Sequence, residues 1–458
     1  MKLYFVGAGG IGMANLVRYY LRHGAQIAGY DRSQSQLTDK LIAEGAKITY
    51  TDSVSEIPEE FRNPDETTVV YTPAVPETNN ILSYFRNNGF EVIKRAALLG
   101  KITRNTEAIC VAGSHGKTTT SSMIANILRD SEKGCTAFLG GILRNIDSNL
   151  VLQEQSAISV IEADEYDRSF HHLSPYIAII TSTDPDHLDI YGDEKHYLEA
   201  FSHFTSLIRP GGTLILHTGL AMTPHTGEDV TIQTYGIHNG DWHAEEIVYG
   251  NGRITFTLVG PDGLRLENLD PGVPVEINID NAVGAAAAAL TAGATPDDVR
   301  HGLKTFLGAK RRFEIWLDGT ETPNHTVLID DYAHSPNEVK ASIESVRKLY
   351  PGRKISVIFQ PHLYTRTRDF APEFADALSE ADEVIMPEIY PAREEPIPGV
   401  TSEIIFNKIK CSQKTLCERK DLLNIIKNSN FEILMTLGAA DIDRLLPEMR
   451  DILGSKLA

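Results

Sequence analysis

Apolar residues in the first hundred positions form short continuous runs that alternate with longer stretches of helical spacing. A short apolar run bounded by glycine and polar residues predicts a buried strand, whereas apolar residues recurring every three or four positions predict an amphipathic helix. Regular alternation of the two is typical of a parallel α/β unit. Strands are predicted at 3–6, 25–30 and 67–71, and helices at 14–23 and 37–44.

The alternation recurs twice more along the chain. A helix-like segment at 96–100 ends the first unit, and a third unit begins near Gly308. Between them lie predicted strands at 157–162, 177–181 and 213–216, β-rich sequence at 230–269 and a helix at 281–294; the third unit has strands at 327–330, 355–360, 383–387 and 431–437. We predict an α/β protein with domains 1–103, 104–307 and 308–458.

Composition narrows the possible functions. A net charge of -19 over 458 residues argues against a general nucleic-acid-binding protein, which needs a basic face. The four cysteines, Cys110, Cys135, Cys411 and Cys417, form no CxxC pair, which favours a reducing cytoplasm. The apolar stretch 282–294 is shorter than a membrane span. We therefore expect a cytoplasmic protein that acts on small molecules, without nucleic acid or membrane as a partner.

A glycine-rich segment with lysine and threonine, Gly-Ser-His-Gly-Lys-Thr-Thr, occupies 113–119 between a predicted strand and a predicted helix. In that setting backbone N–H groups bind phosphate, Lys117 reaches the terminal phosphates and the Thr118 hydroxyl faces Mg²⁺. The spacing is two residues shorter than the usual phosphate loop, and a glycine-rich turn that caps a helix is the alternative. We interpret the segment as an ATP site.

A second glycine motif lies near the N-terminus. Residues 7–12 fit G-x-G-x-x-G after a strand, and Asp31 follows the next strand at the position that holds a ribose in dinucleotide-binding folds. The glycines let a pyrophosphate approach the backbone, and both a dinucleotide and a UDP-sugar contain one. The motif alone leaves both ligands open.

Carboxylates follow two further predicted strands. Four lie within 162–167, and three more surround His187 within 184–189. Repulsion between them is relieved by a metal ion or by solvent, so the interpretations are a magnesium site and a solvated acidic turn.

The third unit has polar clusters after its strands. These are the basic residues 310–312, the segment 330–336 and the aromatic, histidine and arginine group 360–370. An arginine there can clamp a carboxylate or phosphoryl group through two hydrogen bonds, although an exposed loop is the alternative. All lie at carboxyl ends of predicted strands, where open α/β sheets bind ligands.

Together these motifs resemble the Mur ligase family, which joins amino acids to UDP-N-acetylmuramate in peptidoglycan synthesis. The matching motifs are 113–119, Glu-Ala-Asp-Glu at 162–165, Asp-His-Leu-Asp at 186–189, Arg-Arg-Phe-Glu at 311–314 and Asp-Tyr-Ala-His at 331–334. Segments 9–13, 71–76 and 359–368 are most similar to the members that add L-alanine.

The resemblance implies a Rossmann-like N-terminal domain, a central P-loop ATPase-like domain and a C-terminal doubly wound α/β domain that closes over both ligands. The residues implied to contact UDP-N-acetylmuramate are Gly9, Gly10, Ile11, Gly12, Asp31, Thr72, Pro73, Ala74 and Val75. Those implied to bind ATP are Gly113, Ser114, His115, Gly116, Lys117, Thr118, Thr119, Asn278, Asn281, Arg312 and Asp331, with the two asparagines beside adenine.

The resemblance also implies metal, amino-acid and catalytic residues. The metal, Mg²⁺ or Mn²⁺ in its place, would be held by Thr118, Glu162 and His187. The amino acid and the reacting carboxylate would be bound by Tyr332, His334, His362 and Arg366. The implied catalytic set is Lys117, Glu162, His187, His334 and Arg366. Ile277 and Ser335 stand where relatives commonly have histidine, and neither Lys195 nor its neighbours identifies the carbamylated lysine of some relatives.

The implied reaction is ATP-dependent joining of L-alanine to the lactyl carboxylate of UDP-N-acetylmuramate through an acyl phosphate, with ADP and phosphate as products. The alternatives are the tripeptide-recycling ligase of the same family, a nicotinamide oxidoreductase that uses residues 7–12 and Asp31, and a non-catalytic ATP switch. We expect a monomer or homodimer. Alanine, glycine and serine are not distinguished by any local pattern.

Overall fold

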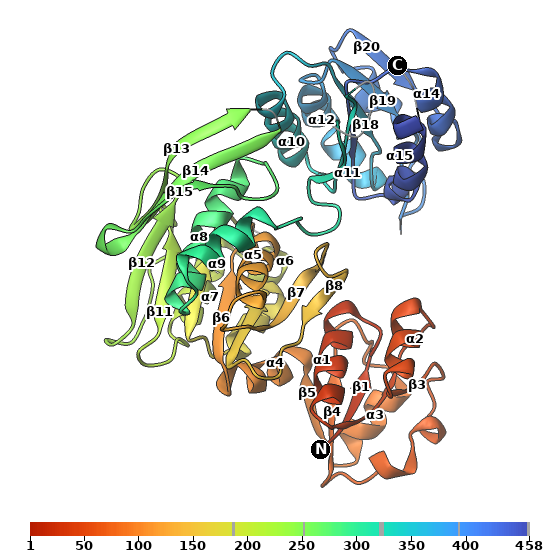
Figure 1. The fold of residues 1–458 in the computed structure, drawn as a ribbon. Coiled ribbons are helices and arrows are strands. Elements are labelled where there is room, and N and C mark those ends of the chain that lie inside the picture. Colours follow the sequence, from red (N-terminus) through yellow and green to blue (C-terminus); the bar gives the residue numbers. More distant parts are fainter. Residues whose placement is uncertain (186–187, 251, 320–324, 393, 456–458) are drawn as a thin grey trace. The chain divides into compact units, whose positions relative to one another are not determined.

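A computed structural model of the chain describes residues 1–185, 188–250, 252–319, 325–392 and 394–455 (Figure 1). The chain divides into two compact units. One comprises 1–243, 259–265 and 280–303, and the other comprises 244–258, 266–279 and 304–458. The domain boundaries predicted after residues 103 and 307 stay a prediction.

The N-terminal sheet has five parallel strands in the order β3-β2-β1-β4-β5. On β1, Leu3 and Phe5 pack into one hydrophobic cluster, whereas Tyr4 and Val6 pack into another. Burial on both faces explains the continuous apolar run, because side chains on a strand alternate between faces. The elements are β1 (Lys2–Val6), α1 (Ile11–Arg22), β2 (Gln26–Tyr30), α2 (Gln36–Ala43), β3 (Lys47–Thr49), β4 (Thr67–Tyr71), α3 (Asn80–Asn87), β5 (Glu91–Lys94) and α4 (Arg95–Arg104).

The second sheet has ten strands in the order β15-β14-β13-β12-β11-β10-β6-β9-β7-β8. β6 lies between β9 and β10 and is parallel to both, so the loops that follow these three strands share one edge. The elements are β6 (Glu107–Ala112), α5 (Lys117–Arg129), β7 (Thr136–Leu143), β8 (Ser148–Val151), β9 (Ile158–Glu162), β10 (Ile177–Ile180), α6 (Leu188–Tyr191), α7 (Glu194–Thr205), β11 (Thr213–His217), β12 (Thr231–Gly236), β13 (Trp242–Gly250), β14 (Arg253–Val259), β15 (Arg265–Leu269), α8 (Ile277–Thr291) and α9 (Pro296–Lys304).

The third sheet has the order β16-β17-β21-β18-β19-β20. Its strands are parallel except β16, which pairs antiparallel with β17. The elements are β16 (Glu314–Asp318), β17 (Val327–Asp331), α10 (Pro336–Leu349), β18 (Ile355–Phe359), α11 (Tyr364–Asp369), α12 (Ala371–Leu378), β19 (Glu383–Met386), α13 (Glu403–Phe406), β20 (Gln413–Leu416), α14 (Leu422–Asn428), β21 (Ile433–Leu437) and α15 (Leu446–Ser455).

The predicted α/β class is confirmed, and each strand predicted from an apolar run begins and ends within about two residues of its predicted bounds. The pattern did not predict the antiparallel β7–β8 pair or the antiparallel edge strand β16. Within the described ranges, no helix has both the length and the apolar character of a membrane span.

Gly100 on α4 offers a test of this packing. A Cβ at this position would collide with the backbone carbonyl of His172, and a backbone atom cannot swing aside. We expect Gly100→Ala to lower the free energy of unfolding by about 1–3 kcal/mol, measured by urea denaturation. Gly454 on α15 is the control, because a Cβ there would have no neighbour within 4 Å. Equal effects of the two substitutions would contradict the packing.

Candidate nucleotide and ligase site

The loop between β6 and α5 has a backbone that only glycine fits. Gly113 has φ 144°, and a Cβ there would strike the Thr181 hydroxyl. Gly116 adopts the left-handed conformation with φ 82° at the N-terminus of α5. The His115 N–H donates to Ser182 Oγ at 2.7 Å, and Ser114 Oγ donates to the Asp184 carbonyl at 2.6 Å. The loop is thus fastened to the segment after β10, with the first turn of α5 at its end.

Lys117 is held by a carboxylate of the acidic segment 162–167 that was not among the predicted ATP or metal residues. Its Nζ donates to the Gly113 carbonyl at 2.5 Å and lies 2.9 and 2.8 Å from the two oxygens of Glu165. The side chains are 14% and 2% exposed, so this is a buried ion pair. Burial raises the pKa of Glu165, and the Lys117 ammonium opposes that rise.

Thr118 and Glu162, two of the three predicted metal ligands, are in contact. Thr118 Oγ1 donates to Glu162 Oε1 at 2.9 Å, and the Gly140 N–H donates to Glu162 Oε2 at 2.8 Å. Hydroxyl and carboxylate oxygens are ligands that Mg²⁺ prefers, so the donor chemistry fits that ion. His187, the third predicted ligand, lies outside the described residues. Thr119, which follows Thr118 on α5, is half-buried.

The two predicted adenine-side asparagines are both buried on the first turns of α8. Asn281 Oδ1 accepts a hydrogen bond from Thr120 Oγ1 at 3.2 Å, which ties α8 to α5 behind the loop. Asn278 Nδ2 donates to the Val273 carbonyl at 3.1 Å. Ile277, at a position where the family resemblance implies histidine, is 62% exposed.

In the N-terminal domain, the two predicted UDP-sugar segments are neighbours. The Gly9 N–H donates to Asp31 Oδ2 at 2.7 Å, so the acid after β2 fastens the glycine loop. A Cβ on Gly7 would lie 2.7 Å from Thr72 Cγ2 and 3.1 Å from Val75 Cγ2. Within these two segments the exposed residues are Gly10, Pro73 and Ala74, and the apolar Ile11 is 56% exposed.

The basic cluster of the third domain separates into two roles. Arg311 donates to the carbonyls of Gly438 at 2.7 Å and Ala440 at 3.0 Å. Its guanidinium also lies 3.5 Å from the fully buried Asp330, whose pKa burial raises to about 6. Arg312 is exposed. Arg311 therefore stabilises the loop that follows β21, whereas the neighbouring cation, Arg312, faces solvent.

The carboxyl end of β17 is formed by Asp331 and is followed directly by residues 332–335. Burial raises the pKa of Asp331, while the Ser342 hydroxyl that donates to its Oδ2 at 2.8 Å lowers it. The rings of Tyr332 and His334 meet edge to face at 5.0 Å. Ser335, the departure from the family pattern, caps α10 by a reciprocal hydrogen-bond pair with Glu338, which gives it a structural reason to be there.

His362 and Arg366 follow β18. The His362 ring stacks on Tyr390 with 6.0 Å between ring centroids. Arg366 is half-buried on α11, and its Nη1 is buried without a hydrogen-bond partner among the described residues. Leu363, which precedes the first residue of α11, has φ 70°. This is a strained conformation for a leucine, and such strain is found most often at binding and catalytic sites.

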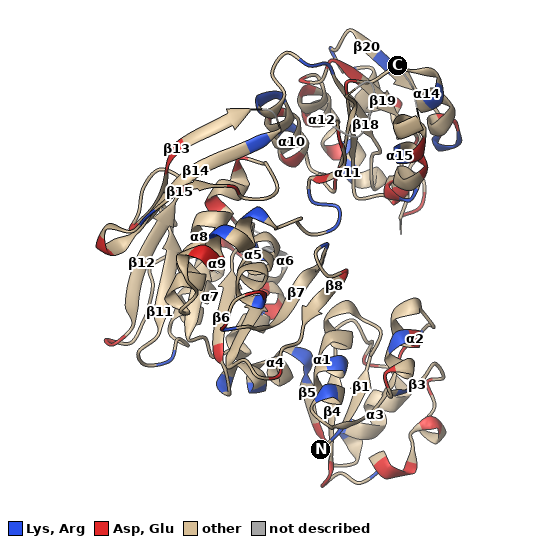
Figure 2. Cartoon of the chain, in the orientation of Figure 1, with Lys and Arg blue, Asp and Glu red and all other residues tan. Residues whose placement is uncertain are grey.

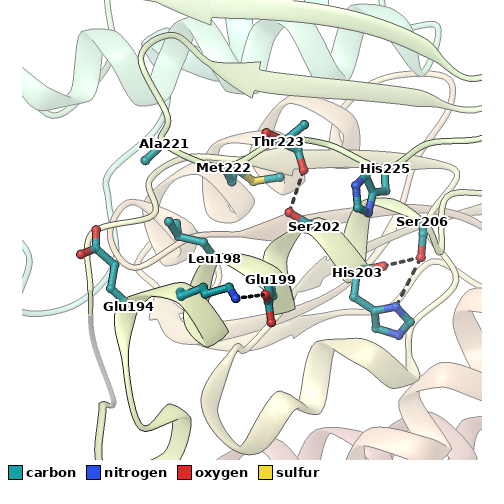
Figure 3. Close-up of a pocket in the computed structure, with 11 residues that line it drawn as sticks. Glu194, Leu198, Glu199, Ser202, His203, Ser206, Ala221, Met222, Thr223 and His225 are labelled. Carbon is teal, nitrogen blue, oxygen red and sulfur yellow. Dashed lines mark hydrogen bonds and ion pairs between the residues drawn. The ribbon is translucent and has the colours of Figure 1, made fainter.

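A cavity of about 700 Å³ lies elsewhere, between α7 and the segment after β11 (Figure 3). None of the predicted site residues lines it. Lys195, on its wall, is exposed and pairs with Glu199 at 3.7 Å.

Glu165 is the partner of Lys117 that the sequence motifs did not identify. It lies within the acidic segment that the sequence singled out, but an acidic run does not reveal which carboxylate is buried against the loop lysine. Glu165 is 1% exposed, whereas Asp164 and Asp167 are half-buried and Tyr166 is exposed.

Removing the Lys117 cation should make stability depend on pH in a defined direction. Without the cation, the folded-state pKa of Glu165 rises further above its unfolded value. The free energy of unfolding is then highest at acidic pH, where Glu165 is protonated, and it falls as pH rises through the folded-state pKa because the buried carboxyl must ionise. We expect Lys117→Ala to lose about 3 kcal/mol of unfolding free energy at neutral pH and less at pH 5, measured by urea denaturation.

The control is the double variant Lys117→Ala/Glu165→Gln, in which no buried charge remains to titrate. It should recover most of the loss at neutral pH. A deficit that is independent of pH, or that the second substitution leaves unchanged, would contradict the buried pair.

Comparisons with known proteins place these features in one family. Family models match along the chain: Mur ligase family, catalytic domain, at residues 2–107; Mur ligase middle domain at 111–289; and Mur ligase, glutamate ligase domain, at 311–432. The chain is 53% identical over 452 residues to a UDP-N-acetylmuramate--L-alanine ligase of Parabacteroides distasonis, covering 98% of this chain and 97% of the relative.

Solved structures agree with the sequence relatives. The UDP-N-acetylmuramate-alanine ligase of Thermotoga maritima is 27% identical, with a TM-score of 0.78 and 98% of both chains covered. A murein peptide ligase of Psychrobacter arcticus shares the fold at 20% identity, with a TM-score of 0.62 and all of both chains covered. These matches favour the predicted ligase over the oxidoreductase interpretation. The chain belongs to the Mur ligase family.

Proposed function

We propose that this protein is an ATP-dependent ligase that joins L-alanine to the lactyl carboxylate of UDP-N-acetylmuramate, with ADP and phosphate as products. The observation that carries the proposal is the 53% identity to a UDP-N-acetylmuramate--L-alanine ligase, which extends over 98% of the chain. The strand–loop–helix geometry of residues 107–129, with Lys117 beside the loop, supports ATP as the energy source.

The three domains divide the substrates between them in this proposal. The glycine loop at 9–12, Asp31 and the turn at 72–75 bind UDP-N-acetylmuramate. Loop 113–119 binds the ATP phosphates, Asn278 and Asn281 lie beside adenine, and Arg312 and Asp331 complete the ATP site. Tyr332, His334, His362 and Arg366 receive the amino acid.

Magnesium, or manganese, belongs to the same proposal. Thr118 and Glu162 would hold the ion, with His187 as the third predicted ligand. The side-chain oxygens of Thr118 and Glu162 are ligands that Mg²⁺ prefers. When bound, the ion neutralises charge on the phosphates and aligns them for transfer.

The chemistry follows from the weakness of a carboxylate as an electrophile. The lactyl carboxylate attacks the γ-phosphorus of ATP, the bond to ADP breaks, and an acyl phosphate forms. Lys117 stabilises the charge that develops on the transferring group. The neutral amine of alanine then attacks the acyl carbon, phosphate leaves, and the nitrogen releases one proton to solvent as the amide forms.

Arg366 is suited to the second step. Its guanidinium has a buried Nη1 without a described hydrogen-bond partner, so it has donor capacity for a carboxylate or for the anionic tetrahedral intermediate. Exclusion of water protects the acyl phosphate from hydrolysis, and the C-terminal domain would provide it by closing. We expect the enzyme to work in the cytoplasm as a monomer or homodimer.

Product analysis tests the substrate assignment. The purified chain is given ATP, Mg²⁺ and UDP-N-acetylmuramate together with L-alanine, glycine, L-serine or a tripeptide, and the products are identified by mass spectrometry. We expect the L-alanine adduct and stoichiometric ADP. Preferential use of the tripeptide would favour the tripeptide-recycling ligase, and ATP hydrolysis that needs neither cosubstrate would favour an ATP switch.

A lysine substitution tests the phosphate loop. Lys117→Ala should lower kcat/KM by about 10²- to 10³-fold or more, because a cation at the transferring phosphoryl group is lost. The matched control is Lys133→Ala, an exposed lysine beyond the other end of α5, which should retain wild-type rates. Near-normal turnover by Lys117→Ala contradicts the assignment.

A further inference from the structure

We propose that Arg95 binds the diphosphate of the sugar nucleotide, as a cation that works together with the glycine loop. The inference rests on the proposed function, because it concerns the same UDP-N-acetylmuramate. Arg95 belongs to none of the motifs that predicted this site.

The topology brings Arg95 to the ligand-binding edge of the N-terminal sheet. In the strand order β3-β2-β1-β4-β5, the chain runs outward from β1 in one direction and from β4 in the other. Ligands of open parallel sheets bind beyond the carboxyl ends of the strands at such a reversal. The glycine loop follows β1, the turn at 72–75 follows β4, and Arg95 follows β5 directly as the first residue of α4. Figure 2 shows basic residues at the junction of β5 and α4.

The side chain of Arg95 lies on the glycine loop itself. A Cβ on Gly12 would be 2.8 Å from Arg95 Nη1 and 3.3 Å from its Cζ. Any side chain at 12 would therefore displace the guanidinium. The last glycine of the motif has a physical reason in this contact, since its missing side chain leaves the space that Arg95 fills.

The guanidinium lacks a counter-ion. Arg95 is half-buried, and among the described residues it makes no side-chain hydrogen bond or ion pair. Its neighbour Lys94 is different, because its Nζ pairs with Asp167 at 2.6 Å. A half-buried cation without a partner is costly, and the cost is recovered when an anion binds.

The N-terminus of α1, which carries partial positive charge, lies beside the Arg95 guanidinium. Gly10 caps this helix without a side-chain hydrogen bond, and the first turn has no acidic residue. The orphan N–H groups and the guanidinium both favour negative charge at one place. A diphosphate can accept from both, and the planar guanidinium matches two phosphate oxygens at once.

Calorimetric titration of the full chain with UDP and with uridine tests the proposal, because the two ligands differ only in the diphosphate. We expect Arg95→Ala to weaken UDP binding by about 10- to 100-fold and to change uridine binding by less than about twofold. Arg95→Lys should fall between Arg95→Ala and wild type, since an ammonium keeps the charge but not the fork. The KM for UDP-N-acetylmuramate should rise with the UDP affinity loss, while the KM for ATP stays unchanged.

The matched control is Arg104→Ala, which removes an exposed arginine from the last position of the same helix and should leave UDP binding intact. UDP binding by Arg95→Ala at the wild-type level would overturn the inference, and so would an equal loss of uridine and UDP affinity, which indicates a structural role. Failure of the wild-type chain to use UDP-N-acetylmuramate would instead refute the proposed function.

Discussion

The ion pair between Lys117 and Glu165 is the interaction on which the phosphate loop depends. A lysine ammonium so little exposed needs a nearby anion, and within the described residues the carboxylate that pairs with it is this buried one. The pair also holds the ammonium 2.5 Å from the Gly113 carbonyl, inside the loop where phosphates are expected. The cation is therefore positioned before a nucleotide arrives, which reduces the ordering cost of binding.

The turn that presents Glu165 is fixed from several sides. Asp167 and Arg168 have φ of 51° and 53°, so two successive residues other than glycine are in the left-handed region. The Asp167 carboxylate pairs with Lys94, and the Arg168 guanidinium lies 4.7 Å from the Tyr191 ring centroid. Tyr191 in turn donates its hydroxyl proton to the Glu165 carbonyl at 2.5 Å. Strained backbone of this kind persists only where surrounding contacts determine it.

The same turn contacts residues of both predicted nucleotide sites. Lys94, which pairs with Asp167, is the last residue of β5, and Arg95 directly follows it against Gly12. The acidic turn thus contacts the phosphate-loop lysine through Glu165 and the edge of the N-terminal sheet through Asp167. One short segment therefore contacts groups at both proposed anion sites, which suits a reaction in which a phosphoryl group passes between two anionic substrates.

The sequence by itself determined the α/β class, most strands and the motifs at their carboxyl ends, because burial on both faces of a parallel strand requires a continuous apolar run and phosphate binding requires glycine at set positions. It left β3, β5, β7, β8, β16 and β20 unpredicted, since these strands lie at or next to a sheet edge, where pairing depends on partners distant in sequence. Only the tertiary structure decided which carboxylate of the acidic turn pairs with Lys117, which of Arg311 and Arg312 is held inside, and that Arg95 lies on Gly12. Those choices depend on burial and on contacts between residues 48 to 129 positions apart in the sequence, and local spacing carries no information about either.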